Sequence, residues 1–315
     1  MSSSAASRPL RAAVALASAG RPQLLADAVR NLELQTTTDF VRIVSVPDEA
    51  SLPDDDSLSG WTIVTGARGL ALQRNAALDA IAGLDPTPGL EGVPGAAVRA
   101  AVDVVFFFDD DAVVRPDYLA AALAFFAGHP EVIGLTGRVL IDGAVSGEVT
   151  VDRADRALAD SLRRPSTGAW RVTRELYGCN FAVRVAPSAG LRFDGRLPLY
   201  SWLEDHDFAR RLMRLGVLAE VDDAVIVHRA ASSGGRQAHT RLGYSQMMNP
   251  IYIWRKGTFP AWLAVREIFR PTSKNLVFSI VGPQSRWRRE RLRGNLIALG
   301  DALRGRITPE RITRL

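Results

Sequence analysis

Residues 102–111 read VDVVFFFDDD, a largely apolar stretch that ends in three consecutive aspartates. The run 102–108 predicts a buried strand of a parallel sheet, because the strands of such sheets are covered on both faces. Ligands of open parallel sheets bind beyond the carboxyl ends of the strands. Asp109, Asp110 and Asp111 are therefore expected to face a cleft.

These three carboxylates indicate a cation site. Adjacent carboxylates repel one another, and burying them is costly unless a cation or hydrogen-bond donors compensate. Mg²⁺ and Mn²⁺ commonly bind through one or two carboxylates together with substrate phosphates. Asp109 and Asp111 stand at alternate positions and form the predicted pair, with Asp110 pointing elsewhere. The alternative is a solvated acidic turn, or a cap for a helix at Asp117.

The sequence before this strand alternates apolar runs with amphipathic stretches. Residues 12–17 predict a short buried strand, and Ser18, Gly20 and Pro22 favour a turn after it. Pro22 suits a first helical turn, and apolar residues follow it at helical spacing. The predicted order is strand 12–17, helix 22–34, strands 41–46 and 62–64, and helix 70–81.

The sequence after the aspartates continues the α/β pattern less regularly. The predicted elements are a helix to residue 128, strands 132–141 and 148–151, helix 205–215, and strands 217–221 and 224–227. From Tyr244 onward the sequence becomes aromatic and basic. We predict an α/β domain at 11–240 and a mostly helical C-terminal extension at 241–315.

The charge is unevenly distributed. The 315 residues carry a net charge of +5, and residues 285–315 hold nine arginines against three acidic residues. This concentration argues against a nucleic-acid-binding protein with a basic face throughout, and it predicts a local patch for anionic lipid or another acidic surface. The alternative is an ordinary solvated helical face. The aromatic residues of the extension suit a membrane interface, or ordinary packing against the α/β domain.

The cysteine content and the apolar runs predict the compartment. Cys179 is the one cysteine, so no internal disulfide forms, and residues 1–11 lack the apolar core of a secretory signal. The longest apolar runs are far shorter than the roughly 20 residues of a membrane span. We expect a cytoplasmic protein, attached peripherally to the inner face of a membrane.

Further polar residues stand at predicted strand and helix ends. Asp205, with Glu204, is placed to take a proton from an attacking hydroxyl, or else it caps the helix that it begins. His228 follows a strand and is either a metal ligand or structural. Arg74 and Asn75 begin a helix after glycines, which favours anion binding.

In order and spacing, these motifs resemble the family 2 inverting glycosyltransferases with a GT-A fold, over residues 11–240. The resemblance implies a Rossmann-like mixed sheet flanked by helices, with a nucleotide-binding half followed by an acceptor-binding half. It is carried by residues 14–22 (VALASAGRP), 73–75 (QRN), 109–111 (DDD), 178–181 (GCNF), 193–195 (FDG) and 202–212 (WLEDHDFARRL). Residues 293–311 also resemble tails of bacterial family members that build surface polysaccharides.

The resemblance implies roles for individual residues. Asp109 would contact the nucleotide sugar, Asp111 the metal and diphosphate, and Asp205 would be the catalytic base. The second strand departs from the family pattern at Asp48, the expected base-reading acid. The donor-binding residues implied are Ser18, Arg21, Asp48, Arg74, Asn75, Asp109 and Asp110, the metal ligands Asp111 and His228, and the acceptor-side residues Gly178, Asn180 and Glu204.

The function that follows is transfer of a sugar from a nucleoside-diphosphate sugar to a hydroxyl of a saccharide or a polyprenyl-linked saccharide. The transfer would need Mg²⁺ or Mn²⁺ and would invert the anomeric configuration. A sugar-nucleotide nucleotidyltransferase is the first alternative, although it normally needs a longer glycine-rich N-terminal loop. A non-catalytic module that binds nucleotide sugars is the second. The sequence predicts no oligomeric state.

Overall fold

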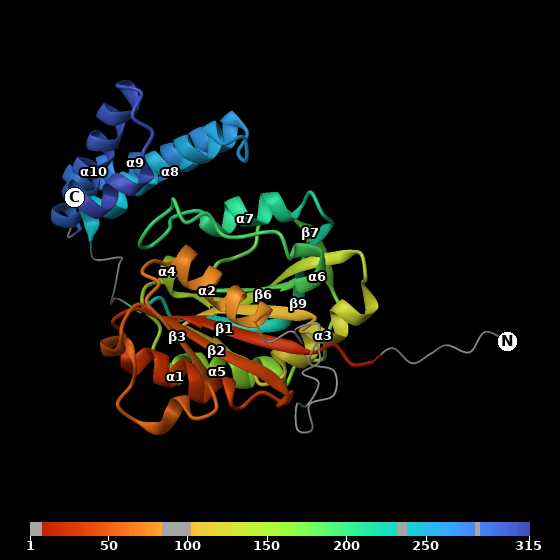
Figure 1. Cartoon of the computed structure of the whole chain (residues 1–315). Helices are drawn as coiled ribbons and strands as arrows, with labels where there is room; N and C mark the ends of the chain where they lie inside the picture. The colour runs from red at the N-terminus through yellow and green to blue at the C-terminus, as the bar shows by residue number, and fades with distance from the viewer. Residues whose placement is uncertain (1–7, 84–101, 232–237, 281–283) are drawn as a thin grey trace.

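The computed structural model describes residues 8–83, 102–231, 238–280 and 284–315, so it includes only the last part of the N-terminal stretch 1–11. In these ranges the strands form one mixed sheet with helices on both faces. Figure 1 shows the C-terminal helices α8, α9 and α10 grouped beside this α/β unit. The predicted α/β fold with a helical C-terminal extension is confirmed.

The first half of the sheet is parallel. β1 (Ala12–Ala17) lies between β2 (Phe40–Val46) and β4 (Val104–Asp109), and β3 (Thr62–Thr65) pairs with β2. The last residue of β1, Ala17, is paired with both Ser45 and Asp109. The segments that follow these three strands therefore leave the sheet at the same edge.

The direction of the strands changes after β4. β8 (Asn180–Arg184) is antiparallel to β4 and to β6 (Val132–Asp142), whereas β6 is parallel to β9 (Val217–His228). β5 (Ala112–Val114) and β7 (Trp170–Thr173) are both antiparallel to β9. The pairing of Ala112 with His228 places the end of β9 directly beside the three aspartates.

The helices cover the two faces of the sheet because β4 is apolar on both. On one face, Phe106 and Phe108 contact Tyr118. On the other, Phe107 contacts Phe181 and Phe193. α1 (Pro22–Leu32) and α3 (Tyr118–Gly128) bury apolar residues against the first face, and α2 (Leu70–Ala82) and α7 (Glu204–Leu212) against the second. The remaining helices of this unit are α4 (Gly143–Ser146), α5 (Val151–Leu162), α6 (Val185–Ser188), η1 (Glu49–Ser51) and η2 (Asp56–Leu58).

The C-terminal extension packs against the segment that leads into α7. It contains α8 (His239–Arg255), α9 (Ala261–Ile280), α10 (Ser285–Leu303) and η4 (Pro309–Arg314). Leu197 and Leu203 belong to the same apolar cluster as Ile253 and Leu263. Lys256 at the end of α8 contacts Asp194 at 2.6 Å and Asp207 at 2.8 Å. Apolar packing and ion pairs thus both join the extension to the α/β unit.

Two predictions of secondary structure are wrong. The strand expected at 148–151 is absent: residues 148–150 form no regular element, and α5 begins at Val151, where the Thr150 side chain accepts from the Arg153 amide as a helix cap. The two strands expected at 217–221 and 224–227 are one strand, β9. Asp223, inside β9, accepts from the amides of Thr167 and Gly168, so its polar side chain does not end the strand.

Candidate functional site

A cavity of about 450 Å³ opens where β1, β2 and β4 end. We call it the strand-end cavity. The loop after β1 reaches it because Gly20 adopts a positive φ of 65°, a backbone conformation that favours glycine. Its lining includes Ser18, Arg21, Asp48, Arg68, Asp109 and Asp111.

A second cavity, of about 310 Å³, lies beside the start of α7, and we call it the α7 cavity. Asp109, Leu70 and Tyr200 line both cavities, so the two are neighbouring parts of one cleft with Asp109 between them. Of the predicted donor residues, Ser18, Arg21 and Asp48 line the strand-end cavity, and of the predicted acceptor-side residues, Gly178 and Glu204 line the α7 cavity. The α7 cavity is lined in part by Asp142, Tyr177, Gly178, Glu204, Asp205 and His228.

Asp109, Asp111 and His228 form a candidate metal site. Each offers a ligand atom, and these atoms lie within 4.8 Å of one another. Nε2 of His228 is 3.5 Å from Oδ1 of Asp111. This nitrogen is buried and has no hydrogen-bond partner in the described ranges of the chain. Two carboxylates and an imidazole nitrogen suit a divalent cation such as Mg²⁺ or Mn²⁺.

The other ring nitrogen of His228 is held by a carboxylate. Nδ1 lies 2.8 Å from Oδ1 of Asp142, and the hydroxyl of Tyr177 donates to Oδ2 of Asp142 at 2.8 Å. Burial alone would lower the pKa of His228, but its contacts with Asp111 and Asp142 raise that pKa to about 9. The carboxylates around this imidazole therefore favour positive charge at the site.

Asp110 lies beside this cluster without belonging to it. Its carboxylate accepts from the Ser18 hydroxyl at 2.5 Å and pairs with Arg21. Burial raises the pKa of Asp110 to about 7, although Arg21 opposes the shift. Arg21 also lies 3.8 Å from Asp111. Asp110 thus holds both the loop after β1 and the Arg21 guanidinium beside the candidate metal site.

Arg74 lies beneath the cleft and is only 2% exposed. Its guanidinium donates to Asp109 at 3.0 Å and to the Gly178 carbonyl at 2.6 Å, and it pairs with Glu204. Burial raises the pKa of Glu204 to about 8, against the effect of Arg74. One buried arginine therefore connects the residues of both cavities.

Asp205 is held by backbone donors at the first turn of α7. Its Oδ2 accepts from the Gly178 amide at 2.9 Å and its Oδ1 from the His206 amide at 2.8 Å. A Cβ atom on Gly178 would lie 2.9 Å from Oδ2 of Asp205, so a side chain at residue 178 would displace the carboxylate. The helix begins after Leu203, whose φ is positive, and not with Asp205 as its cap.

Three further predicted site residues also have partners within the protein. The Asn75 side chain bonds both the amide and the carbonyl of Phe193. Asn180 is fully buried and bonds Tyr118 and the Gly137 amide. Asp48 lines the strand-end cavity but pairs with Arg68 at 2.7 Å. Their roles toward a donor or an acceptor stay predictions.

Several residues of the cleft could not be predicted from the sequence. Asp142 and Tyr177 lie behind His228, and neither belongs to a recognisable motif. Leu199 and Tyr200 line the strand-end cavity from the segment before α7. Leu199 has a positive φ of 59°, a conformation uncommon for residues other than glycine, and no sequence pattern predicts it. The Leu199 carbonyl accepts a hydrogen bond from the Leu70 amide at 2.9 Å, and the Leu199 backbone lies close to Gly69.

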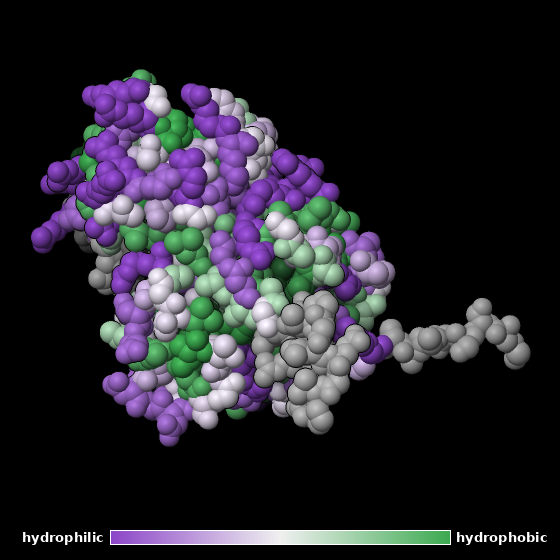
Figure 2. All heavy atoms as spheres, viewed as in Figure 1, coloured by the Kyte–Doolittle hydropathy of each residue, from purple (hydrophilic) through white to green (hydrophobic). Residues whose placement is uncertain are grey.

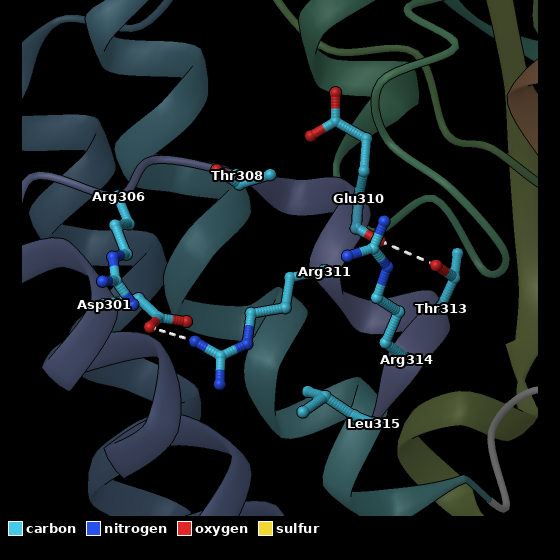
Figure 3. Close-up of a pocket in the computed structure, with 8 residues that line it drawn as sticks. All are labelled: Asp301, Arg306, Thr308, Glu310, Arg311, Thr313, Arg314 and Leu315. Carbon is cyan, nitrogen blue, oxygen red and sulfur yellow. Dashed lines mark hydrogen bonds and ion pairs between the residues drawn. The ribbon is translucent and has the colours of Figure 1, made fainter.

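A third cavity, of about 560 Å³, lies within the C-terminal extension. Figure 3 shows that its lining is polar and includes the ion pair between Asp301 and Arg311. The residues that line it come from α10, from η4 and from the segments beside η4. It shares no lining residue with the cleft, so it is separate from the candidate site.

Comparisons with known proteins find similarity in structure alone. No protein-family model and no curated protein sequence matches the chain. The mannosyltransferase PcManGT from Pyrobaculum calidifontis, solved in complex with GDP-Man and Mn²⁺, superposes with a TM-score of 0.54 at 16% identity, over 94% of this chain and 88% of that one. Residues 1–349 of S. aureus TarS give a TM-score of 0.52 at 14% identity, over 96% and 82%.

A further structure of S. aureus TarS matches at a TM-score of 0.46 and 15% identity, and the match covers 76% of this chain. The chain spans 40% of the length of that TarS structure. The two matches with higher TM-scores extend over nearly the whole chain, C-terminal helices included. The chain therefore has the GT-A α/β fold that the sequence predicted, the fold of a mannosyltransferase solved with its nucleotide sugar and a divalent cation.

Proposed function

We propose that this protein is an inverting glycosyltransferase that moves a sugar from a nucleoside-diphosphate sugar to a hydroxyl group. The observation that carries the proposal is the position of Asp109, Asp111 and His228 at the junction of two contiguous cavities. A cation at this junction would neutralise the diphosphate that leaves. The fold of PcManGT, a protein solved with GDP-Man and Mn²⁺, supports this choice.

The donor would occupy the strand-end cavity. Asp109, Asp111 and His228 would hold Mg²⁺ or Mn²⁺ with the diphosphate, and Arg21 would contribute positive charge beside it. Arginine suits phosphate oxygens because its planar guanidinium can donate two parallel hydrogen bonds. Ser18 and Asp48 line the same cavity and would contact the nucleoside. Arg74 would fix Asp109 from below, since it is buried and paired.

The acceptor would enter the α7 cavity, where Asp205 acts as general base. Its carboxylate takes the proton from the acceptor hydroxyl, and the hydroxyl oxygen attacks the anomeric carbon from the face opposite the diphosphate. The bond from that carbon to the diphosphate oxygen breaks as the new bond forms, so the configuration inverts. The Gly178 and His206 amides hold the base in one orientation during this step.

The proposed acceptor is a saccharide, and in particular one linked to a polyprenyl lipid at the cytoplasmic face of a membrane. Among the residues that line the α7 cavity is Glu267 of α9, so the aromatic and basic extension contributes to its lining. An extension of this kind suits an acceptor that is presented from a lipid surface.

A thermal-shift screen tests the proposal. The purified chain is heated with each nucleoside diphosphate and its common sugar derivatives, with and without Mn²⁺. A ligand at 100 times its Kd stabilises a protein by about 2.7 kcal/mol, so a specific donor is easily detected. We expect one nucleotide to stabilise the chain only when Mn²⁺ is present. Pyrophosphate release from a nucleoside triphosphate and a sugar phosphate would instead support the nucleotidyltransferase.

A further inference from the structure

One face of α9 is apolar and exposed. Trp262, Val265, Phe269, Leu276 and Ile280 are 59%, 63%, 69%, 53% and 72% exposed. At roughly 100° per residue these five side chains fall within an arc of about 60° on the helix, and the exposed Val277 and Phe278 lie outside that arc. Single exposed apolar residues are normal, but an aligned set marks an interaction surface. We call these five residues the α9 stripe.

The opposite side of α9 already has its packing partners. Leu263, Ala264, Asn275 and Ser279 are buried, and α9 packs against both α8 and α10. The Asn275 amide donates to Gln246 of α8 and to Asn295 of α10. The helix is therefore fixed in the bundle by one face, and the α9 stripe is left on the outside.

Basic residues run beside the α9 stripe. At roughly 100° per residue, Arg266 and Arg270 lie about 40° and 80° beyond the edge of the α9 stripe, so both flank it, whereas Lys274 lies about 120° beyond that edge. The long stems of such side chains can lie on an apolar surface while their charges reach outward. Figure 2 shows hydrophilic residues gathered over the C-terminal helices, with hydrophobic ones between them. An apolar strip with a basic flank is typical of a helix that lies in a membrane interface.

Charge decides between the two partners that fit an apolar strip. In a symmetric pair of chains, the basic flanks of two copies would be brought together, and residues 285–315 would add nine arginines against three acidic residues on each side. An anionic lipid surface complements this charge instead of repelling it. In the described ranges no helix is long and apolar enough to cross a bilayer, so α9 would lie on the surface.

We propose that the α9 stripe, with the flanking Arg266 and Arg270, binds the surface of an anionic lipid bilayer. The same helix borders the α7 cavity through Glu267, and Arg266 lies 3.4 Å from Glu175 of the α/β unit. Binding of α9 would therefore hold the cleft near the bilayer, where a lipid-linked acceptor is found. The placement of the cleft near a lipid-linked acceptor rests on the proposed function, whereas the binding of lipid by α9 does not.

Vesicle co-sedimentation with the full chain tests the proposal. The probes are vesicles of phosphatidylcholine and vesicles that also contain phosphatidylglycerol, at low and high salt. We expect binding to the anionic vesicles that weakens as salt rises, because exposed charges are then screened. The variant Phe269→Ser/Leu276→Ser should bind at least about tenfold more weakly, since burying each side chain contributes roughly 1.5–3 kcal/mol. Arg270→Glu should reduce the preference for phosphatidylglycerol.

The matched control is Leu34→Ser/Val172→Ser, which removes two equally exposed apolar side chains elsewhere, and it should bind like the wild type. The proposal would be overturned if the wild type did not bind the vesicles. It would also be overturned if the Phe269→Ser/Leu276→Ser variant bound them as strongly as the control variant. If the wild type forms a dimer and the Phe269→Ser/Leu276→Ser variant does not, the α9 stripe binds a second copy of the chain instead of lipid. All variants should keep wild-type Mn²⁺ affinity, so failure here is distinct from failure of the glycosyltransferase assignment.

Discussion

The Asp142 carboxylate lies 2.8 Å from Nδ1 of His228, on the side of the ring that faces away from Asp111. A carboxylate in this position keeps a proton on Nδ1, so Nε2 is the nitrogen that would bind a cation in exchange for its own proton. Nε2 is the buried atom that has no hydrogen-bond partner in the described ranges. In the proposed metal site, Asp142 would therefore orient the imidazole of His228 so that Nε2 faces the cation.

We expect Asp142→Asn to weaken Mn²⁺ binding roughly 10- to 100-fold, the usual effect of losing such a partner. Asparagine still caps α4, as Asp142 does through the Ala144 amide, so the fold should be retained. Calorimetric titration with Mn²⁺ alone measures the change, and Asp152→Asn on the exposed side of α5 is the control. If the two variants bind Mn²⁺ with equal affinity, Asp142 does not support the metal site.

Asp205→Asn should lower turnover by roughly 10²- to 10⁴-fold, since a positioned base contributes about that much. Mn²⁺ and nucleotide binding should stay at wild-type levels, because Asp205 lies in the other cavity. Initial rates with the donor found in the thermal-shift screen give the first quantity, and calorimetry gives the second. A variant that turns over normally would show that another group accepts the proton.

Gly178→Ala tests the positioning of the base without changing its chemistry. The new Cβ would lie 2.9 Å from Oδ2 of Asp205 and push the carboxylate aside. A misplacement of about 1 Å can cost roughly 100-fold, so kcat should fall by about that factor while Mn²⁺ affinity is unchanged. Gly190→Ala, where a Cβ has nothing within 4 Å, is the control. Equal kcat values for the two variants would contradict the assigned geometry.

Asp194 should make the stability of the chain depend on pH. Burial alone would raise its pKa, but hydrogen bonds, the strongest from Lys256, lower it below the ordinary value. The stabilisation is therefore present above the unfolded pKa near 3.9 and is lost as pH falls through the lower folded value. Asp194→Asn should lose about 2 kcal/mol at neutral pH. Thermal unfolding at several pH values should show this difference shrinking in acid; a constant difference would contradict it.

Much of the parallel half of the fold could be predicted because its signals are local. The apolar runs of β1, β2 and β4 and the glycines and prolines after them mark strands and turns in the sequence itself. The start of α5 was missed because residues 148–151 are consistent with a strand until the Thr150 cap is seen. Asp222 and Asp223 suggested a break in β9 because their pairing with residues 166–169 is not local.

The candidate site could be predicted only where a residue belongs to a motif. Asp109, Asp111, Asp205 and His228 stand at strand ends or a helix start, and the structure brings them to one cleft. Asp142 could not be found, because it contacts His228 across 86 positions of sequence. The burial of Arg74 under both cavities depends in the same way on distant partners.

The central claim is that Asp109, Asp111 and His228 hold a divalent cation together with a nucleoside diphosphate. Calorimetric titration of the nucleotide found in the thermal-shift screen, with and without Mn²⁺, into the wild type and Asp111→Ala tests it most directly. We predict Mn²⁺-dependent binding to the wild type and weak, Mn²⁺-independent binding to Asp111→Ala, with both chains folded. Equal, Mn²⁺-dependent binding to both chains would contradict the claim.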